Sequence, residues 1–252
     1  MKKTTLFLIS LLFVLTSCAN DIKTKPEKTV TKRGLIVPLV DSLKYSEEYC
    51  CILLPEQGFS VYDGPKGKII GTIKRIGDKK TDDQVPYKIY FVSGNKKAEV
   101  NNYREIGYEL FALNYTDSVQ GYLKILDPLK NHWLNVSEIK KHGFKAMSWR
   151  DFMIGQSQDV LGYYANEPGL RLRKKPNTDG EIISSVRGDL FEIKLTTETY
   201  GQWCKVKVTK YREHPCNTEL NEKENIEYKT EGWLKIIDDN GEPNLYNYTR
   251  GC

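Results

Sequence analysis

Cysteine and histidine are the residue types in this chain that could supply a nucleophile, a proton carrier or a metal ligand. The chain has six cysteines and three histidines, His132, His142 and His214. Their spacing matches no metal site, and no HExxH, GxSxG or paired CxxC motif occurs. The segment 64–68, GPKGK, is too short for a phosphate-binding loop. We therefore expect no metal, no cofactor and no catalysis.

The adjacent cysteines Cys50 and Cys51 fall in a predicted strand, where they would face opposite sides. A disulfide between them would be strained, so we expect two thiols. The chain could be an enzyme only if a pocket brought one of these thiols next to His132 or His142. The prediction is accordingly a protein that is not an enzyme.

Three further cysteines lie in the second half of the chain. Cys204 shares its strand parity with aliphatic neighbours and is expected to be a buried thiol. Cys216 lies in a polar loop and Cys252 at the C-terminus, so a disulfide between these two could tie the chain end to the loop. A disulfide between Cys204 and Cys216 is the alternative.

The N-terminal residues predict the cellular location of the protein. Two lysines precede an apolar run, 6–15, that is too short to span a bilayer. The run ends in LTSC, which resembles the lipobox of bacterial lipoproteins. This resemblance implies a signal peptide at 1–17, a lipid on Cys18 that contacts the membrane, and, from Ala19, delivery to the outer membrane, facing the periplasm of the cell envelope. A plain signal peptide with a chance cysteine is the alternative.

Charge gives little information about partners. The formal net charge of +5 becomes +3 once Lys2 and Lys3 of the signal are removed. The basic residues of segment 20–33 lie in a polar tether, where they serve solvation or, alternatively, contact an anionic membrane surface. No clustered stripe of basic and aromatic residues occurs, so nucleic acid is not expected as a partner.

An internal repeat indicates two copies of one small fold. The stretch 169–186, GLRLRKKPNTDGEIISSV, occurs in edited form at 58–73, GFSVYDGPKGKIIGTI. The stretch 232–238, GWLKIID, likewise echoes 121–127, GYLKILD. The offset is 111 residues at the start of both pairs. A chain of 252 residues is long enough for two domains of about 100 residues each.

Short apolar runs with a period of two, bounded by turn residues, predict β-strands. They occupy 35–40, 49–54, 59–61, 68–73, 87–92, 109–113, 121–127, 132–139, 170–173, 182–186, 190–195, 203–208 and 232–238. The segments 94–107 and 209–230 are expected to be polar loops. The stretch 143–162 does not alternate and predicts a connector with a short helix, whose Trp149 and Phe152 pack between the halves.

The second half is similar to the bacterial SH3 (SH3b) pattern. The residues that carry this resemblance are Gly169, Leu170, Leu172, Arg173, Pro176, Ile182, Ile183, Val186, Trp203, Val206, Gly232, Trp233 and Leu234. The first half departs from the pattern, with Tyr62 in place of the arginine and Tyr122 in place of the tryptophan. The resemblance implies small barrels that bind peptidoglycan peptides or other peptides. The whole layout also resembles lipoproteins of Bacteroidetes-type bacteria.

We therefore predict an all-β fold of two small SH3-like barrels in tandem with a short, partly helical connector. The segments are a signal peptide (1–17), a lipid-anchored tether and entry segment (18–45), a divergent SH3b-like domain (46–142), a connector (143–162) and an SH3b-like domain (163–252). Strand parity sends one set of side chains inward. This set is Leu170, Leu172, Val206, Val208, Leu234 and Ile236.

The same parity sends Trp203 and Trp233 outward, and these are the candidate ligand-binding residues, with Tyr163, Tyr164 and Arg173 nearby. The alternative role for the tryptophans is to cover the edge of the barrel. The predicted function is a non-catalytic, lipid-anchored cell-envelope protein that binds peptidoglycan or a peptide. The alternative is a structural lipoprotein that docks onto an envelope protein. The ligand, the oligomeric state, the membrane leaflet, the disulfide connectivity and the use of one or both halves stay open.

Overall fold

The computed structural model describes residues 33–39, 54–55, 57–76, 88–107, 110–125, 131–155 and 161–248. Its strands, joined by turns and three short α-helices in the described residues, confirm the all-β prediction. The predicted signal peptide and residues 49–53 of the predicted strand 49–54 lie outside the described residues. So do Cys18, Cys50, Cys51 and Cys252.

The elements of the first half are β1 (Gly34–Pro38), β2 (Phe59–Tyr62), β3 (Ile69–Ile76), β4 (Lys88–Ser93), β5 (Lys96–Glu99), β6 (Tyr103–Gly107), β7 (Leu110–Tyr115), β8 (Asp117–Val119), β9 (Tyr122–Ile125), β10 (His132–Asn135), α1 (Val136–Lys141), β11 (Phe144–Ser148) and α2 (Trp149–Gly155). Those of the second half are β12 (Gly162–Ala165), β13 (Leu170–Arg173), β14 (Ile182–Val186), β15 (Phe191–Tyr200), β16 (Trp203–Tyr211), the 3-10 helix η2 (Pro215–Asn217), α3 (Glu222–Asn225), β17 (Ile226–Lys235) and β18 (Leu245–Tyr248).

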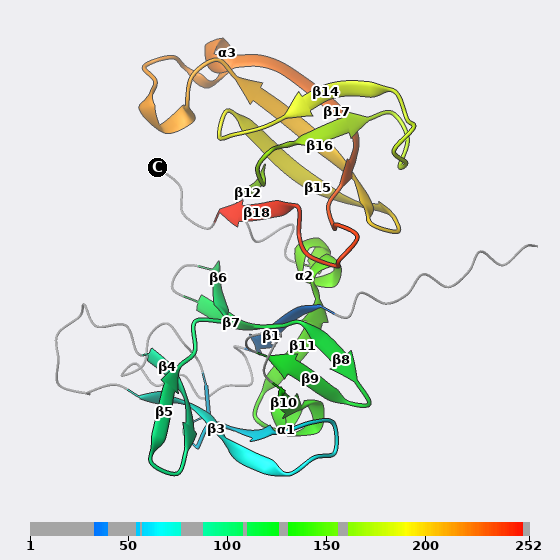
Figure 1. The fold of residues 1–252 in the computed structure, drawn as a ribbon. Helices are drawn as coiled ribbons and strands as arrows, with labels where there is room; N and C mark the ends of the chain where they lie inside the picture. Colours follow the sequence, from blue (N-terminus) through cyan, green and yellow to red (C-terminus); the bar gives the residue numbers. More distant parts are fainter. Residues whose placement is uncertain are drawn as a thin grey trace, which may run out of the picture.

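The first half contains two sheets, with the strand orders β11-β1-β7-β6 and β5-β4-β3-β2-β10-β9-β8. The second half contains one sheet, with the order β14-β13-β17-β16-β15-β12-β18. Figure 1 shows the two groups of strands, with α2 lying between them.

The same succession of antiparallel pairs occurs twice. In the first half β2 pairs with β3 and β10, β10 with β9, and β1 with β7 and β11. In the second half β13 pairs with β14 and β17, β17 with β16, and β12 with β15 and β18. The bend at Thr116 separates β7 from β8, whereas β15 runs through the equivalent place as one strand with a register shift.

Two glycines make the start of the repeated hairpin possible. Gly58 and Gly169 have φ angles of 77° and 100°, which disfavour other residues. A Cβ atom on Gly58 would lie 2.1 Å from the carbonyl oxygen of Ile73, and one on Gly169 would lie 2.8 Å from that of Val186. Each glycine therefore lets the chain enter β2 or β13 in close contact with the backbone of the next strand.

The strand pairing corrects the predicted alignment of the repeat. Trp233 lies opposite Arg173, and the residue in the same place opposite Tyr62 is Trp133 of β10. Tyr122 lies on β9, the counterpart of β16, so it does not take the place of Trp233. The similarity of 121–127 to 232–238 therefore joins strands that are not equivalent, and the first half has its tryptophan after all.

Several segments differ from the sequence prediction. The predicted polar loop at 209–230 contains the end of β16, α3 and the start of β17. The predicted polar loop at 94–107 contains β5 and β6. The predicted strand 132–139 ends at Asn135, whose Oδ1 accepts hydrogen bonds from the backbone N–H of Ser137 (2.8 Å) and Glu138 (3.2 Å) and so starts α1. The predicted connector contains β11, which pairs with β1, so the predicted boundaries at 45 and 143 separate strands of one sheet.

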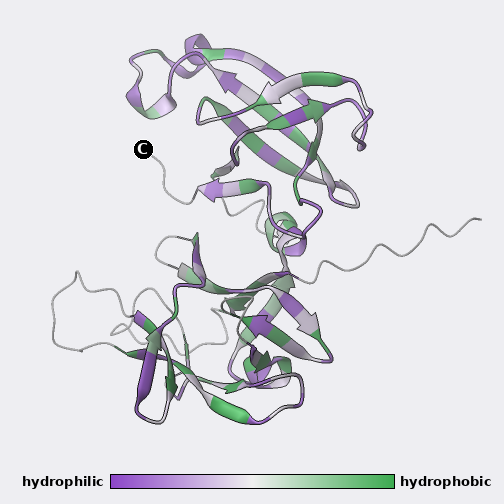
Figure 2. Ribbon diagram, viewed as in Figure 1, coloured by the Kyte–Doolittle hydropathy of each residue, from purple (hydrophilic) through white to green (hydrophobic). Residues whose placement is uncertain are grey.

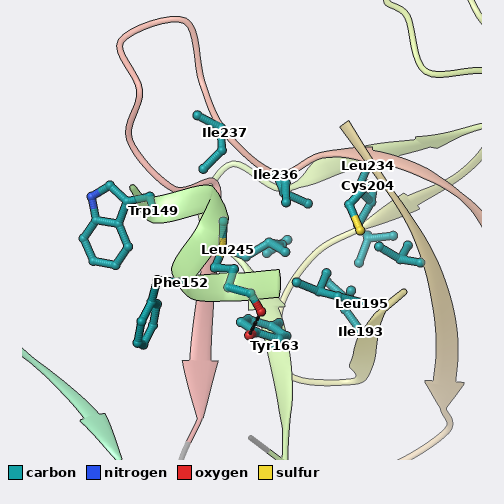
Figure 3. Packing of buried hydrophobic residues seen from close by; sticks show 14 of the residues in the cluster. Trp149, Phe152, Tyr163, Ile193, Leu195, Cys204, Leu234, Ile236, Ile237 and Leu245 are labelled. Carbon is teal, nitrogen blue, oxygen red and sulfur yellow. Dashed lines mark hydrogen bonds between the residues drawn. The ribbon is translucent and has the colours of Figure 1, made fainter. Parts of the chain in front are cut away.

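Two buried hydrophobic clusters hold the chain together. Alternating hydrophobic and hydrophilic residues along β15 and β16 are visible in Figure 2. The predicted inward residues are buried in the cluster of the second half, apart from Leu170, which is half-buried. The same cluster takes in Leu35 and Ala112 of the first half and, as predicted, Trp149 and Phe152 of α2 (Figure 3). The halves therefore share a core.

Candidate functional site

The predicted ligand surface lies on three neighbouring strands, β13, β17 and β16. Trp233 of β17 pairs with Arg173 on one side and Lys205 on the other, so these three residues form a row across the sheet. Trp203 pairs with Lys235 in an adjacent row, which makes the two tryptophans diagonal neighbours on one face. We call Arg173, Trp203, Lys205, Trp233 and Lys235 the tryptophan face.

The two tryptophans are not equally accessible. Trp203 is on the opposite face from the core residue Cys204, as predicted from parity, but only 7% of it is exposed. Trp233 is half-buried. The prediction that Trp203 offers an exposed contact surface is therefore wrong, and Trp233 is the tryptophan that a ligand could touch.

Arg173 is partly committed to the scaffold. Its guanidinium donates a hydrogen bond to the carbonyl oxygen of Gly180 at 2.6 Å, which closes the turn between β13 and β14. The backbone N–H of Lys174 donates to the carbonyl oxygen of Glu181 at 2.9 Å in the same turn. Since Arg has five N–H donors, Arg173 keeps donors for a ligand.

The lysines of the tryptophan face are paired with carboxylates. Lys205 Nζ lies 3.2 Å from Glu198 Oε1 and 3.7 Å from Glu231 Oε1, and both interactions raise its pKa. Lys235 Nζ lies 2.6 Å from Asp239 Oδ1. Such solvated pairs are weak, so an anionic ligand could replace the carboxylates at small cost.

Tyr163 does not belong to any ligand surface. It is 1% exposed, and its hydroxyl donates to the carbonyl oxygen of Met153 at 3.0 Å within the shared core (Figure 3). Burial raises its pKa. The sequence prediction was wrong here because β12 turns this side chain toward α2.

Tyr164 points to the other face of β12, but it lies near a different group of residues from the tryptophan face. Its ring stacks on that of Tyr248, with centroids 4.5 Å apart. Glu192 belongs to β15, which pairs with β12 at Tyr163 and Ile193, and it acts electrostatically on both rings. Tyr211 of β16 donates a hydrogen bond to Glu192 Oε2 at 2.6 Å. We call Tyr164, Glu192, Tyr211 and Tyr248 the tyrosine cluster.

Sequence reasoning missed three members of the tyrosine cluster. The alternation along β15 and β16 places Glu192 on the outer face, so sequence reasoning could have found this residue. The sequence of 245–248, in contrast, did not indicate β18. The position of Tyr248 also depends on Gly162, because a Cβ atom there would lie 2.2 Å from the Tyr248 hydroxyl oxygen.

Two cysteines fall in the described residues. Cys204 is a free, buried thiol, as predicted, so the alternative disulfide with Cys216 is wrong. Burial raises the pKa of this thiol to about 11. Cys216 is disulfide-bonded. Its partner lies outside the described residues, and a bond with Cys252 stays a prediction.

Within the described ranges, no group of three or more His, Cys, Asp or Glu residues could hold a metal ion. Nor does any helix in that part of the chain have the length and apolar character needed to cross a membrane. Comparison with protein-family models, with curated proteins and with solved structures found no match to this chain.

Proposed function

We propose that this chain is a lipid-anchored binding protein of the cell envelope, made of two SH3-like barrels, that recognises peptidoglycan or a peptide through its second half. The repeated strand pairing supports the two-barrel arrangement. The observation that carries the binding role is the row of Arg173, Trp233 and Lys205, because it combines a half-buried indole with two cations on an outward face.

The row suits an extended peptide with acidic groups. The indole of Trp233 offers a flat apolar surface and an N–H donor. Arg173 and Lys205 flank it and can each donate to a carboxylate or to a backbone carbonyl oxygen. Peptide stems of peptidoglycan carry both kinds of acceptor. The lipid anchor on Cys18 and the place at the outer membrane, facing the periplasm, belong to the same proposal.

Binding to purified sacculi tests this function. We expect the chain to sediment with sacculi, and Trp233→Ala combined with Lys205→Ala to abolish sedimentation. Ile69→Ala is the matched control. Ile69 is an apolar side chain that is 62% exposed, and it lies on β3, in a sheet of the first half that does not contain the row. Retention that is unchanged in the double variant would remove the tryptophan face from the function.

A structural role, docking onto an envelope protein, is the second candidate, and the edge strand β14 favours it. β14 is the terminal strand of its sheet, and it exposes Ile182 (44%) and Ile183 (37%). Exposed aliphatic side chains on an edge strand suit the addition of an extended strand from a protein partner. A single protein adduct after cross-linking in cells, lost in Ile182→Lys and without sacculus binding, would favour this role.

A further inference from the structure

The tyrosine cluster is a built arrangement and not a chance group of surface residues. The stacked rings of Tyr164 and Tyr248 come from the neighbouring strands β12 and β18. Gly162 leaves the room that the Tyr248 hydroxyl needs. Glu192 is held by the hydroxyl of Tyr211 at 2.6 Å, although it belongs to a strand whose outer face carries exposed residues.

The cluster has the electrostatic character of a cation site. The side chain of Glu192 is only 17% exposed, so its charge is less screened than that of a surface carboxylate. Asp189 and Glu222 act electrostatically on Tyr164 and Tyr211. The faces of tyrosine rings attract cations, and they do so more strongly where water is partly excluded.

An ammonium group of the chain itself already binds to the carboxylate. Lys194 Nζ lies 2.7 Å from Glu192 Oε1, on a side chain that is 65% exposed. Holding the flexible, solvated Lys194 side chain at Glu192 costs side-chain entropy, so another ammonium can replace it. Lys194 therefore shows which chemical group Glu192 accepts and competes for it at the same time.

The geometry points to a binding site for a primary alkylammonium group, held by Glu192 against the rings of Tyr164 and Tyr248 and in exchange with Lys194. The ligand is a small molecule or a peptide side chain that carries an aliphatic amine. Trp203 and Tyr211 are eight residues apart on β16, or roughly 26 Å, so the site is separate from the tryptophan face. It depends on no residue used in the proposed function.

Nuclear magnetic resonance titration of the purified chain tests the site. The probes are Nα-acetyl-lysine amide, which presents a peptide side chain, and pentane-1,5-diamine, which presents a free amine. The Nε-acetylated form of the first probe is the neutral control. We expect saturable shifts of Tyr164, Tyr211 and Tyr248 resonances with at least one amine and none with the neutral form. The stronger probe identifies the source of the amine.

Two substitutions, each with a control, are expected to change the affinity for the amine in opposite directions. Glu192→Gln should weaken binding about tenfold, whereas Glu198→Gln, which changes an exposed, lysine-paired carboxylate on the same strand, should leave it unchanged. Lys194→Met should strengthen binding several-fold because it removes the competing ammonium. Lys174→Met is its matched control, since Lys174 is also an exposed lysine (58%) that pairs with a carboxylate, that of Glu181, outside the tyrosine cluster.

A variant that folds poorly cannot bind more tightly, so the gain in Lys194→Met separates this site from a structural role of the cluster. Equal affinity of Glu192→Gln and the unchanged chain would overturn the proposal. Weaker binding by Lys194→Met, or shifts that also occur with the neutral probe, would overturn it as well. Loss of sacculus binding by the tryptophan-face variants has no bearing on these outcomes.

Discussion

Trp133 lies directly opposite Tyr62 across the pair of strands β10 and β2. The second half has Trp233 opposite Arg173 in the equivalent pair, so both halves present an indole at one position. The surroundings differ, because Trp133 is 7% exposed and Trp233 is half-buried. The ring of Tyr62 packs edge-on against that of Tyr122, with centroids 5.4 Å apart, where the second half has Arg173 and Trp203 at the corresponding positions. Only the second half therefore keeps this position open.

This difference predicts unequal costs of removing the two indoles. Trp133→Ala should lower the free energy of unfolding by about 3–5 kcal/mol, as for other buried tryptophans. Trp233→Ala should cost clearly less, because part of its ring is already in contact with water. Urea unfolding of both variants measures the two values. Equal losses would mean that Trp233 is a core residue and is unsuited to contact a ligand.

The glycines at the start of the repeated hairpin give a second prediction. Gly58→Ala and Gly169→Ala place a methyl group in contact with a backbone carbonyl oxygen, at a positive φ angle. We expect each to lower stability by more than the roughly 1 kcal/mol that the φ angle alone costs.

Gly188→Ala is the matched control for both glycines, because Gly188 has a φ angle of 75° but nothing lies within 4 Å of its Cβ position. Thermal unfolding midpoints of the three variants separate the contact from the conformational cost. Midpoints that fall equally would show that the close approach at Gly58 and Gly169 contributes nothing.

The sequence predicted five of the seven strands described in the second half and missed β12 and β18, and physical reasons explain the differences. β13 and β14 have the predicted bounds, since period-two alternation and flanking turn residues mark both ends. Parity sent Trp203 to the correct face, but parity cannot say what covers a face. The repeat was misaligned because 121–127 and 232–238 are similar in sequence, whereas structural equivalence of two segments depends on which strands they pair with.

The tyrosine cluster could not be predicted from the sequence, for a similar reason. Its rings meet through the pairing of β12 with β18, two strands that are more than seventy residues apart along the chain. Local patterns carry no information about such a pairing. The stacking of Tyr164 on Tyr248 also depends on the missing side chain of Gly162, which no periodicity indicates.

Arg104 predicts a coupling between the two halves. Its guanidinium lies 5.0 Å from the ring centroid of Trp149 in α2 and 4.9 Å from that of Tyr246 in β18. Burial lowers the pKa of this group, and its Nε atom has no hydrogen-bond partner among the described residues. The two rings, together with the charge of Glu242, therefore stabilise a half-buried cation.

Arg104→Lys should lower the free energy of unfolding by about 1 kcal/mol, because an ammonium cannot stack its plane on two rings. Arg171→Lys, at an exposed position of β13, should change nothing. A double-mutant cycle with Tyr246→Leu should give a coupling energy of about 0.5–1 kcal/mol. Strict additivity in that cycle would show that Arg104 does not join the halves through Tyr246.

Cys204 predicts how stability changes at alkaline pH. Its thiol is fully buried and lies 3.3 Å from the carbonyl oxygen of Thr196, and burial raises its pKa from 9.0 to about 11. The folded chain thus keeps a proton that the unfolded chain releases above pH 9. This contribution to stability is fully present below that pH and is lost as the pH rises toward 11.

We expect the free energy of unfolding to fall by about 2 kcal/mol between pH 9 and 11 through this thiol. Cys204→Ala should flatten the first part of the decline. The later part should remain, because burial also raises the pKa of Tyr115 from 10.0 to about 12. Urea unfolding at a series of pH values compares the two chains. If both lose the same stability between pH 9 and 10, the thiol ionises as freely in the folded chain as in the unfolded one, and the burial of Cys204 has no electrostatic consequence.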